Sequence, residues 1–244
     1  MTRDVLTLAA LRAGVLTIAI GLAGSLAIAR VDAQQVGEKG AEAKRVTDAT
    51  AVLSQVISAK DTVIPRAVLE KAEAIAVFPY VEQSARVRGQ GPNTRRVAHE
   101  MGIRARGVVS VRNEKGTWSA PAFVTLNGGG RMLGDVVFVI PSRQGTDHIL
   151  SEPFALDAEG VAVVGPSGPD GAQAAIAPST EVLVYSRPRE AAAKMEFKGV
   201  TVWRDQDSTQ NFYGKPLTNE QAIAQEKAPE PVAAWQAALK KHVR

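Results

Sequence analysis

The chain has 244 residues, of which 45% are hydrophobic, and it contains no cysteine. That hydrophobic fraction is enough for a packed core, which excludes a disordered chain, and the missing thiols exclude disulfides, cysteine-ligated zinc and a cysteine nucleophile. The formal net charge of +4 permits an anionic partner such as lipid headgroups, nucleic acid or an acidic protein, without choosing among them.

Residues 1–33 have the pattern of an export signal. Arg3 and Arg12 precede an uncharged run over residues 13–29, and the segment closes with the small-residue ending Val31-Asp32-Ala33. This order is typical of a cleaved signal peptide, so we expect cleavage after Ala33 and a location in the periplasm or cell envelope. The uncharged run is close to the minimum length for crossing a bilayer, which leaves a retained membrane anchor and a core helix as alternatives.

A linker and two helices are predicted next. Residues 34–47 begin with a polar, glycine-containing stretch and are assigned to the linker, and a domain is expected over residues 48–215. Pro65 predicts the start of a short second helix, because proline suits a first helical turn. The apolar run over residues 74–78, ahead of Pro79, predicts a buried strand. The first helix is amphipathic, and its apolar residues recur at helical spacing at Val46, Ala49, Val52, Leu53, Val56 and Ile57.

After residue 104 the hydrophobic period changes to two. Alternating residues over 107–112 and 118–125 predict two antiparallel strands, with a turn at residues 113–116 between them. Because proline cannot donate a hydrogen bond to a β-ladder, Pro121 predicts that the return strand lies at an edge or carries a bulge. We expect Trp118 to anchor the packing of this hairpin.

The remaining pattern predicts more strands and a helical tail over residues 216–244. A capping box at Thr218 and Gln221 predicts one helix start, and Pro231 predicts another. The fold class is therefore α+β, with N-terminal helices packed on a mostly antiparallel sheet or barrel-like sandwich and a C-terminal helical tail. The additional strands are expected at residues 136–140, 160–164, 181–186 and 199–203.

No residue pattern predicts catalysis. Asp147 and His148 have Ser142 and Ser151 nearby, but adjacent residues point apart, so this grouping is a weak candidate for nucleophilic catalysis. The three histidines are widely spaced and lack a metal-ligand motif. Residues 128–130 are three glycines without the lysine of a phosphate loop, and are expected to form a turn. We expect no enzyme activity, metal or cofactor.

Arginines are concentrated between residues 86 and 112, where Glu100 is the sole acid. The neighbouring Gly and Pro residues predict an exposed loop, and arginine's planar charged group suits phosphate and carboxylate. Two interpretations are equally weighted: binding to an anionic surface, and a solvated or internally paired loop. Nucleic acid is not expected, because aromatic residues for base stacking are missing from this stretch. The cluster consists of Arg86, Arg88, Arg95, Arg96, Arg104, Arg106 and Arg112.

Several motifs resemble the SYLF domain family. The most specific is G-x-W-S-A-P-A-F, which ends at Phe123, and it follows R-G-V-V-S-V-R over residues 106–112. The segments over residues 64–77, 185–187 and 211–214 are also similar to that domain. The resemblance spans residues 48–215. It implies a non-enzymatic domain: eukaryotic members bind phosphoinositide membranes, some also bind actin filaments, and bacterial members are exported and regarded as phospholipid-binding.

The resemblance places the family's lipid contact on a basic amphipathic helix, which corresponds here to Lys44, Arg45 and Lys60. Two departures leave it open whether this contact is preserved, moved, or replaced by a site for another anionic envelope component. Residues 83–106 are arginine-rich where the family has a Gly-rich apolar segment, and residues 190–196 replace the usual Gly-Leu-Phe-Ala-Gly. The expected function is binding of anionic phospholipid or a similar envelope polyanion; the alternative is a structural or protein-interaction module without lipid affinity.

Overall fold

The computed structural model describes residues 40–59, 64–88, 98–129, 134–151, 153–156, 161–164, 180–188, 199–226 and 229–243; residues 83–88, 98–101, 161–164 and 188 are described by their backbone alone. From Glu42 onward the chain forms one compact unit. The predicted signal peptide lies outside the described residues, and the boundaries predicted for the SYLF-like domain and the tail stay predictions.

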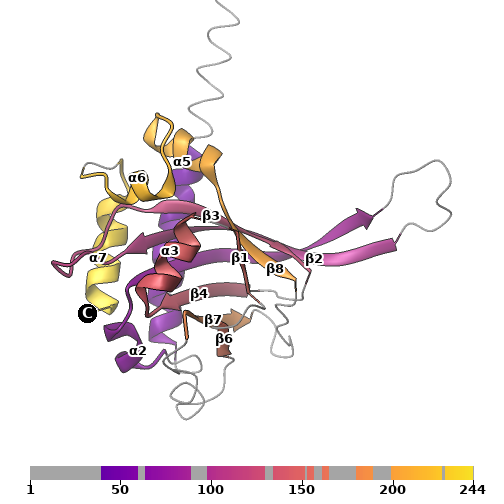
Figure 1. The fold of residues 1–244 in the computed structure, drawn as a ribbon, viewed down its shortest axis with the longest axis horizontal. Helices are drawn as coiled ribbons and strands as arrows, with labels where there is room; N and C mark the ends of the chain where they lie inside the picture. The colour runs from indigo at the N-terminus through magenta and orange to yellow at the C-terminus, as the bar shows by residue number, and fades with distance from the viewer. Residues whose placement is uncertain are drawn as a thin grey trace, which may run out of the picture. The chain divides into compact units, whose positions relative to one another are not determined.

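One sheet organises the described residues, and Figure 1 shows helices packed around it. Its eight strands run in the order β5-β8-β3-β2-β1-β4-β7-β6, and every neighbouring pair is antiparallel except β6 and β7. The predicted α+β class with a mostly antiparallel sheet is confirmed. The strands are β1 (Ala74–Arg88), β2 (Ala98–Val111), β3 (Ala122–Gly128), β4 (Gly134–Ile140), β5 (Phe154–Ala155), β6 (Val161–Val164), β7 (Val182–Pro188) and β8 (Val200–Arg204).

Helices flank the sheet at both ends of the chain. Those predicted around residues 46–57 and after Pro65 are present, as are the capping box at Thr218 and the helix after Pro231. The first helix already begins at residue 40, inside the predicted linker. The helices are the one over residues 40–58, α2 (Arg66–Glu70), α3 (Arg143–Ser151), α5 (Gln206–Tyr213), α6 (Asn219–Ile223) and α7 (Val232–His242).

Alternation of side chains between the faces of the sheet creates two apolar layers. In β1, Val77 enters the layer covered by the 40–58 helix, α2 and α7, whereas Phe78 enters the layer covered by α3 and α6. In β2, Val108 and Val109 divide in the same way. Burial on both faces explains why the central strands are nearly continuous runs of apolar residues.

The hairpin predicted from period-two alternation is confirmed as β2 and β3. The Asn113 side chain accepts hydrogen bonds from two backbone N–H groups of the turn. The predicted edge position is wrong, because β3 lies between β2 and β8. The alternative of a bulge at Pro121 is supported: Arg112 pairs with Trp118 and Val109 with Ala122, so the return strand contains one extra residue between these pairs.

Four arginines of the cluster, Arg86, Arg88, Arg104 and Arg106, lie on strands instead of a loop, whereas residues 89–93, whose Gly and Pro residues predict the exposed loop, lie outside the described residues. β1 continues through Pro79 to Arg88, β2 begins at Ala98, and the two strands pair from Glu82 and Arg104 to their far ends. The ladder satisfies the backbone of both strands, and charged side chains are compatible with an exposed strand face, so composition alone misassigned this segment. The register shifts between Val77 and Glu82, where Tyr80 has a positive φ of 57°.

The tail is part of the core. Trp235 of α7 is fully buried, and its indole Nε1 donates a 2.8 Å hydrogen bond to the Ser110 hydroxyl of β2. Trp118 lies nearby in the same apolar layer, and its Nε1 is 3.4 Å from the Val243 carbonyl oxygen that it faces. The β2–β3 hairpin, which we call the scaffold hairpin, and the C-terminal helix therefore stabilise each other.

Replacing Trp118 by alanine should lower the free energy of unfolding by about 3 to 5 kcal/mol, because a large buried side chain leaves a cavity. The matched control is Trp203→Ala, whose side chain is 48% exposed compared with 6% for Trp118. We expect the control to change stability by less than about 0.5 kcal/mol. Urea unfolding of both variants measures this difference, and equal stabilities would contradict the assignment of Trp118 to the core.

Candidate functional site

The structure separates the predicted lipid-binding residues into three groups. Arg86 and Arg88 lie in the far part of β1, where the backbone alone is described. Arg104 and Arg106 lie on β2 with exposed side chains, and Lys44 and Arg45 lie on the 40–58 helix. The remaining predicted residues, Arg95, Arg96 and Lys60, lie outside the described residues.

Arg45 is a buried structural residue, and the prediction that it contacts lipid is corrected. Its guanidinium donates to the carboxylate of Asp205 at 3.0 Å and to the hydroxyl of Ser208 at 3.1 Å. Its Nη2 lies 3.8 Å from Glu42, and it stacks over the Phe123 ring. Burial lowers the pKa of Arg45 from its usual value, and Asp205 opposes that change. Arg45 therefore remains charged and paired, and it is not available to an external anion.

Lys44, the neighbouring residue, points into solvent. Its ammonium lies 2.6 Å from the Asp48 carboxylate one helical turn away, and this hydrogen bond raises the pKa of Lys44. Lys44 and Arg45 are adjacent on the helix for which the family resemblance implies a lipid contact, yet Lys44 is exposed and Arg45 is buried. Of the predicted helix cations that the structure describes, Lys44 alone can meet an external surface.

Arg112 is half-buried, and its guanidinium is bonded within the protein. Its guanidinium donates to the carbonyl oxygens of Glu70 and Val243, at 3.1 and 3.3 Å, and lies over the Trp118 ring. These contacts join the end of α2, the scaffold hairpin and the C-terminus. The interpretation of the arginine cluster as internally paired holds for this residue.

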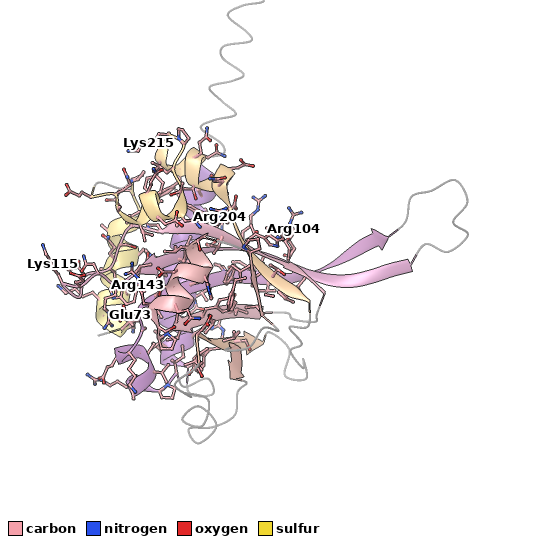
Figure 2. All side chains as sticks on the ribbon, in the orientation of Figure 1. Glu73, Arg104, Lys115, Arg143, Arg204 and Lys215 are labelled. Atoms are coloured by element: carbon pink, nitrogen blue, oxygen red, sulfur yellow. The ribbon has the colours of Figure 1, made fainter. Side chains whose placement is uncertain are left out.

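Arg104 and Arg106 line a polar hollow of about 340 Å³, which we call the basic hollow. The hollow is also lined by Thr125 and Asn127 of β3, by Arg204 at the end of β8, and by the Asp205–Asp207 segment at the start of α5. Figure 2 shows Arg104 and Arg204 close together and away from Lys115 and Arg143. The strand register explains the convergence, because Arg106 lies opposite Thr125, and Arg104 lies opposite Asn127.

The hollow is basic because its buried acid is already neutralised. The Asp205 carboxylate binds Arg45 and accepts hydrogen bonds from the backbone and hydroxyl of Ser208, as the N-cap of α5. In the part of the chain that the structure describes, Arg104, Arg106 and Arg204 form no ion pair within 4.0 Å. Asp207, in the first turn of α5, is the exposed acid of the lining. Positive charge therefore exceeds available negative charge at this surface.

The groups considered for catalysis do not assemble into a catalytic site. His148 Nδ1 lies 2.9 Å from the Glu181 carboxylate, whereas Ser142 accepts from the Gly145 N–H and Ser151 donates to the Asp147 carbonyl. The residues described contain no cluster of three or more His, Cys, Asp or Glu side chains that could hold a metal ion. Within the same residues, no helix combines the length and apolarity that a membrane span requires.

The motifs that resemble the SYLF family meet in space as structural contacts. The Tyr213 hydroxyl donates a 2.7 Å hydrogen bond to the Pro121 carbonyl, and the Phe212 and Phe123 rings are 5.1 Å apart. Gly214 ends α5 in the left-handed conformation, at φ 70°. Arg187 pairs with Asp135 at 2.8 Å. These motif residues hold the sheet and helices together.

Sequence reasoning missed Arg204, Thr125 and Asn127 as neighbours of the arginine cluster. Arg204 is about a hundred residues from Arg104 along the chain, and the two come together because β3 pairs with both β2 and β8. No local signal could have identified this convergence, because it depends on strand order.

Comparisons with known proteins agree with the motifs. Residues 127–242 match the model of the family described as "Ysc84: Las17-binding protein actin regulator". Protein YSC84 of Saccharomyces cerevisiae is 28% identical over 183 residues, which cover 70% of this chain and 36% of that protein. LAS seventeen-binding protein 3 of the same species is 25% identical over 190 residues, covering 73% of this chain and 38% of that protein. No solved structure matches.

The fold and the surface together define an α+β domain that combines a scaffold sheet with an arginine-lined hollow. The matched model is that of the Ysc84 family, which is the SYLF family indicated by the motifs, and the chain is similar to it over residues 127–242. It spans little more than a third of the length of the curated relatives named above.

Replacing Arg45 by methionine should destabilise the protein by about 3 to 5 kcal/mol, because Asp205 and Glu42 would lose their buried counter-charge. Lys44→Met removes the same charge from the adjacent, exposed position and should leave the urea unfolding midpoint close to that of the parent. Unfolding of the two variants at neutral pH measures the contrast. An Arg45→Met protein as stable as Lys44→Met would show that the Arg45–Asp205 pair contributes little.

Proposed function

We propose that this chain is an exported, non-enzymatic domain that binds anionic phospholipid, or a similar envelope polyanion, through the far part of the β1–β2 hairpin and the basic hollow at its base. The observation that supports this proposal best is the exposure of Arg104, Arg106 and Arg204 without acidic partners among the described residues. Unpaired, exposed arginines favour anionic surfaces, because each basic residue near such a membrane contributes on the order of 1 kcal/mol.

An exposed tryptophan supports a membrane surface as the partner. Trp203 on β8 lies opposite Thr125, which in turn lies opposite Arg106, so the three residues form one row across the sheet. Directly opposed residues in antiparallel strands place their side chains on the same face. Tryptophan is enriched at membrane interfaces, where its ring is apolar and its N–H remains hydrated. An exposed aromatic beside arginines matches the polarity of a headgroup layer.

The hairpin extends the positive charge away from the core. Arg86 and Arg88 belong to β1 beyond the last residue of that strand in the apolar layers, Val81. Arg95 and Arg96 lie in the segment that joins β1 to β2, outside the described residues. The hairpin ladder carries Arg86 and Arg88 on a regular element instead of a loop, which would reduce the conformational entropy lost on binding a surface.

The second candidate is a protein-interaction module without lipid affinity. The relatives in yeast support it, because one is named for binding LAS seventeen and the family description names an actin regulator. Both candidates use the same scaffold and differ in the partner of the exposed surface. Vesicle flotation distinguishes them, since a protein-interaction module has no reason to bind lipid in a charge-dependent way.

The parent protein should float with vesicles of phosphatidylcholine mixed with phosphatidylglycerol, but not with phosphatidylcholine alone. Replacing Arg86, Arg88, Arg95 and Arg96 together by glutamine should weaken this binding by about two to three orders of magnitude at low salt, because the contributions of surface charges accumulate. A charge-matched control replaces Lys71, Lys115, Lys215 and Lys240, which are exposed on other elements.

Circular dichroism and thermal unfolding of both variants should match the parent, because the control lysines are exposed and arginine side chains are rarely buried without a partner. If the folded arginine variant binds as the parent does, the hairpin is not the contact, and the exposed face of the 40–58 helix with Lys44 becomes the preferred surface. Absence of flotation with any anionic composition would favour the protein-interaction candidate.

Export is part of the proposal and rests on the pattern of residues 1–33. We expect N-terminal sequencing of the protein recovered from an expressing bacterium to begin at Gln34, because the small residue Ala33 precedes it. Recovery of a chain that still begins near Met1 from the membrane fraction would instead support the retained anchor.

A further inference from the structure

We infer that the basic hollow is a preformed site for a phosphomonoester, which is a phosphate group carrying close to two negative charges. If the phosphate belongs to a lipid headgroup, this inference rests on the proposed function. If the phosphate belongs to a soluble molecule, the inference is independent of the proposed function. It goes beyond summed surface charge, because it assigns one position to one chemical group. Its basis is that three arginines from two strands line a single concave surface.

The three arginines come from elements that are not neighbours in sequence. Arg104 and Arg106 are two residues apart on β2, so their side chains emerge on the same face of the strand. Arg204 ends β8, which is separated from β2 by β3. All three line the basic hollow. Like charges brought together in this way repel each other unless an anion compensates them, and the described residues supply no acid within ion-pairing distance.

The floor between the arginines is polar and oriented. The Asn127 amide donates a 3.1 Å hydrogen bond to the Thr125 hydroxyl oxygen. The threonine hydroxyl can accept that bond and still donate its own proton, so it offers a neutral donor between the guanidinium groups. A phosphate dianion accepts hydrogen bonds through its oxygens and has no proton to donate, so its site requires donors. A lining of arginine and hydroxyl donors meets this requirement.

The acids near the hollow offset only part of this charge, because Glu82 lies opposite Arg104 and Asp207 lines the hollow, both at the surface. Asp205 is bound by Arg45 from the protein side, and its second oxygen caps α5. Asp207 opposes an anion, but it is exposed to solvent, where screening weakens its effect.

The size of the hollow suits a single headgroup. Its volume of about 340 Å³ lies at the low end of the range of roughly 300 to 1,000 Å³ for small-molecule sites. The exposed Trp203 lies beside two of its lining residues, in the row that contains Thr125 and Arg106. A phosphate at the end of a lipid could therefore enter while Trp203 meets the headgroup layer.

The first test uses inorganic phosphate and the intrinsic fluorescence of the full chain. Of its three tryptophans, Trp118 and Trp235 are buried and Trp203 is exposed, so phosphate in the hollow should change the emission of Trp203. We expect a saturable change with phosphate and none with chloride at equal ionic strength. The change should be lost in Trp203→Phe. It should also be lost in the triple variant Arg104→Gln, Arg106→Gln and Arg204→Gln.

The second test compares vesicles of equal surface charge, one set containing phosphatidic acid, a phosphomonoester, and the other phosphatidylglycerol, a phosphodiester. The parent should prefer phosphatidic acid by about tenfold, as expected for additional charge-assisted hydrogen bonds. The triple variant should lose this preference. The charge-matched control Lys115→Gln, Lys215→Gln and Lys240→Gln should retain it, because these exposed lysines lie outside the hollow.

The outcomes separate this inference from the proposed function. Phosphate binding without binding to any vesicle would support the hollow as a site for a soluble phosphomonoester and would overturn the membrane proposal. Equal binding to both vesicle types, together with no saturable response to phosphate, would overturn the hollow as a site while leaving charge-dependent membrane binding intact. Preserved phosphatidic acid preference in a folded triple variant would also overturn it.

Discussion

The ion pair between Arg45 and Asp205 connects parts of this domain that lie 160 residues apart in the sequence. The helix over residues 40–58 supplies the arginine, and the junction between β8 and α5 supplies the aspartate. Asp205 also caps α5, and its backbone N–H donates to the Phe123 carbonyl of β3. One buried charge pair therefore fixes a helix on the sheet, starts a second helix and attaches β8 to the scaffold hairpin.

The same pair determines the charge of the neighbouring surface. If Asp205 were unpaired, its carboxylate would face Arg104, Arg106 and Arg204 from within the hollow and would offset part of their charge. Because Arg45 holds it from the protein side, the external arginines keep an excess of positive charge. Stability and surface electrostatics are thus coupled through one residue, and the adjacent Lys44, exposed on the same helix, has no part in this coupling.

One face of the sheet is covered by helices near one end of β2 and exposed to solvent further along the strand. On β2, Val108 and Ser110 lie under the 40–58 helix and α7, whereas Arg106 and Arg104 occupy the same face and are exposed. The alternation that builds the core therefore continues into the exposed part of the strand with arginine in place of valine. An exposed basic surface arises where the covering helices end, and the backbone ladder needs no change.

The sequence predicts the local elements well because their signals are local. Helical spacing from Val46 to Ile57, the capping box at Thr218 and the alternation around Trp118 each correspond to the observed structure. Composition misassigned the arginine-rich segment as a loop, since the pairing of β1 with β2 depends on a partner strand. α3 and α5 were not predicted, because α3 contains Gly145 and α5 is mostly polar.

The candidate site was predictable in part. Arg104 and Arg106 belong to a visible cluster, but Arg204 joins them through strand order alone. Arg45 has the sequence signature of a surface cation on an amphipathic helix, and its burial depends on an acid 160 residues away. Pairing over such a distance has no local signal, so helix periodicity could not distinguish Arg45 from Lys44.

Hydrogen–deuterium exchange of the full chain, with and without anionic vesicles, tests most directly whether this surface is the contact. Binding through the hairpin and the hollow predicts slower exchange in the peptides that cover the β1–β2 hairpin, the end of β8 and the first turn of α5. The peptides of α2 and α7, which contribute no residue to the lining of the hollow, should be unchanged. Protection confined to the 40–58 helix, α2 or α7, with none at the hairpin or β8, would contradict it.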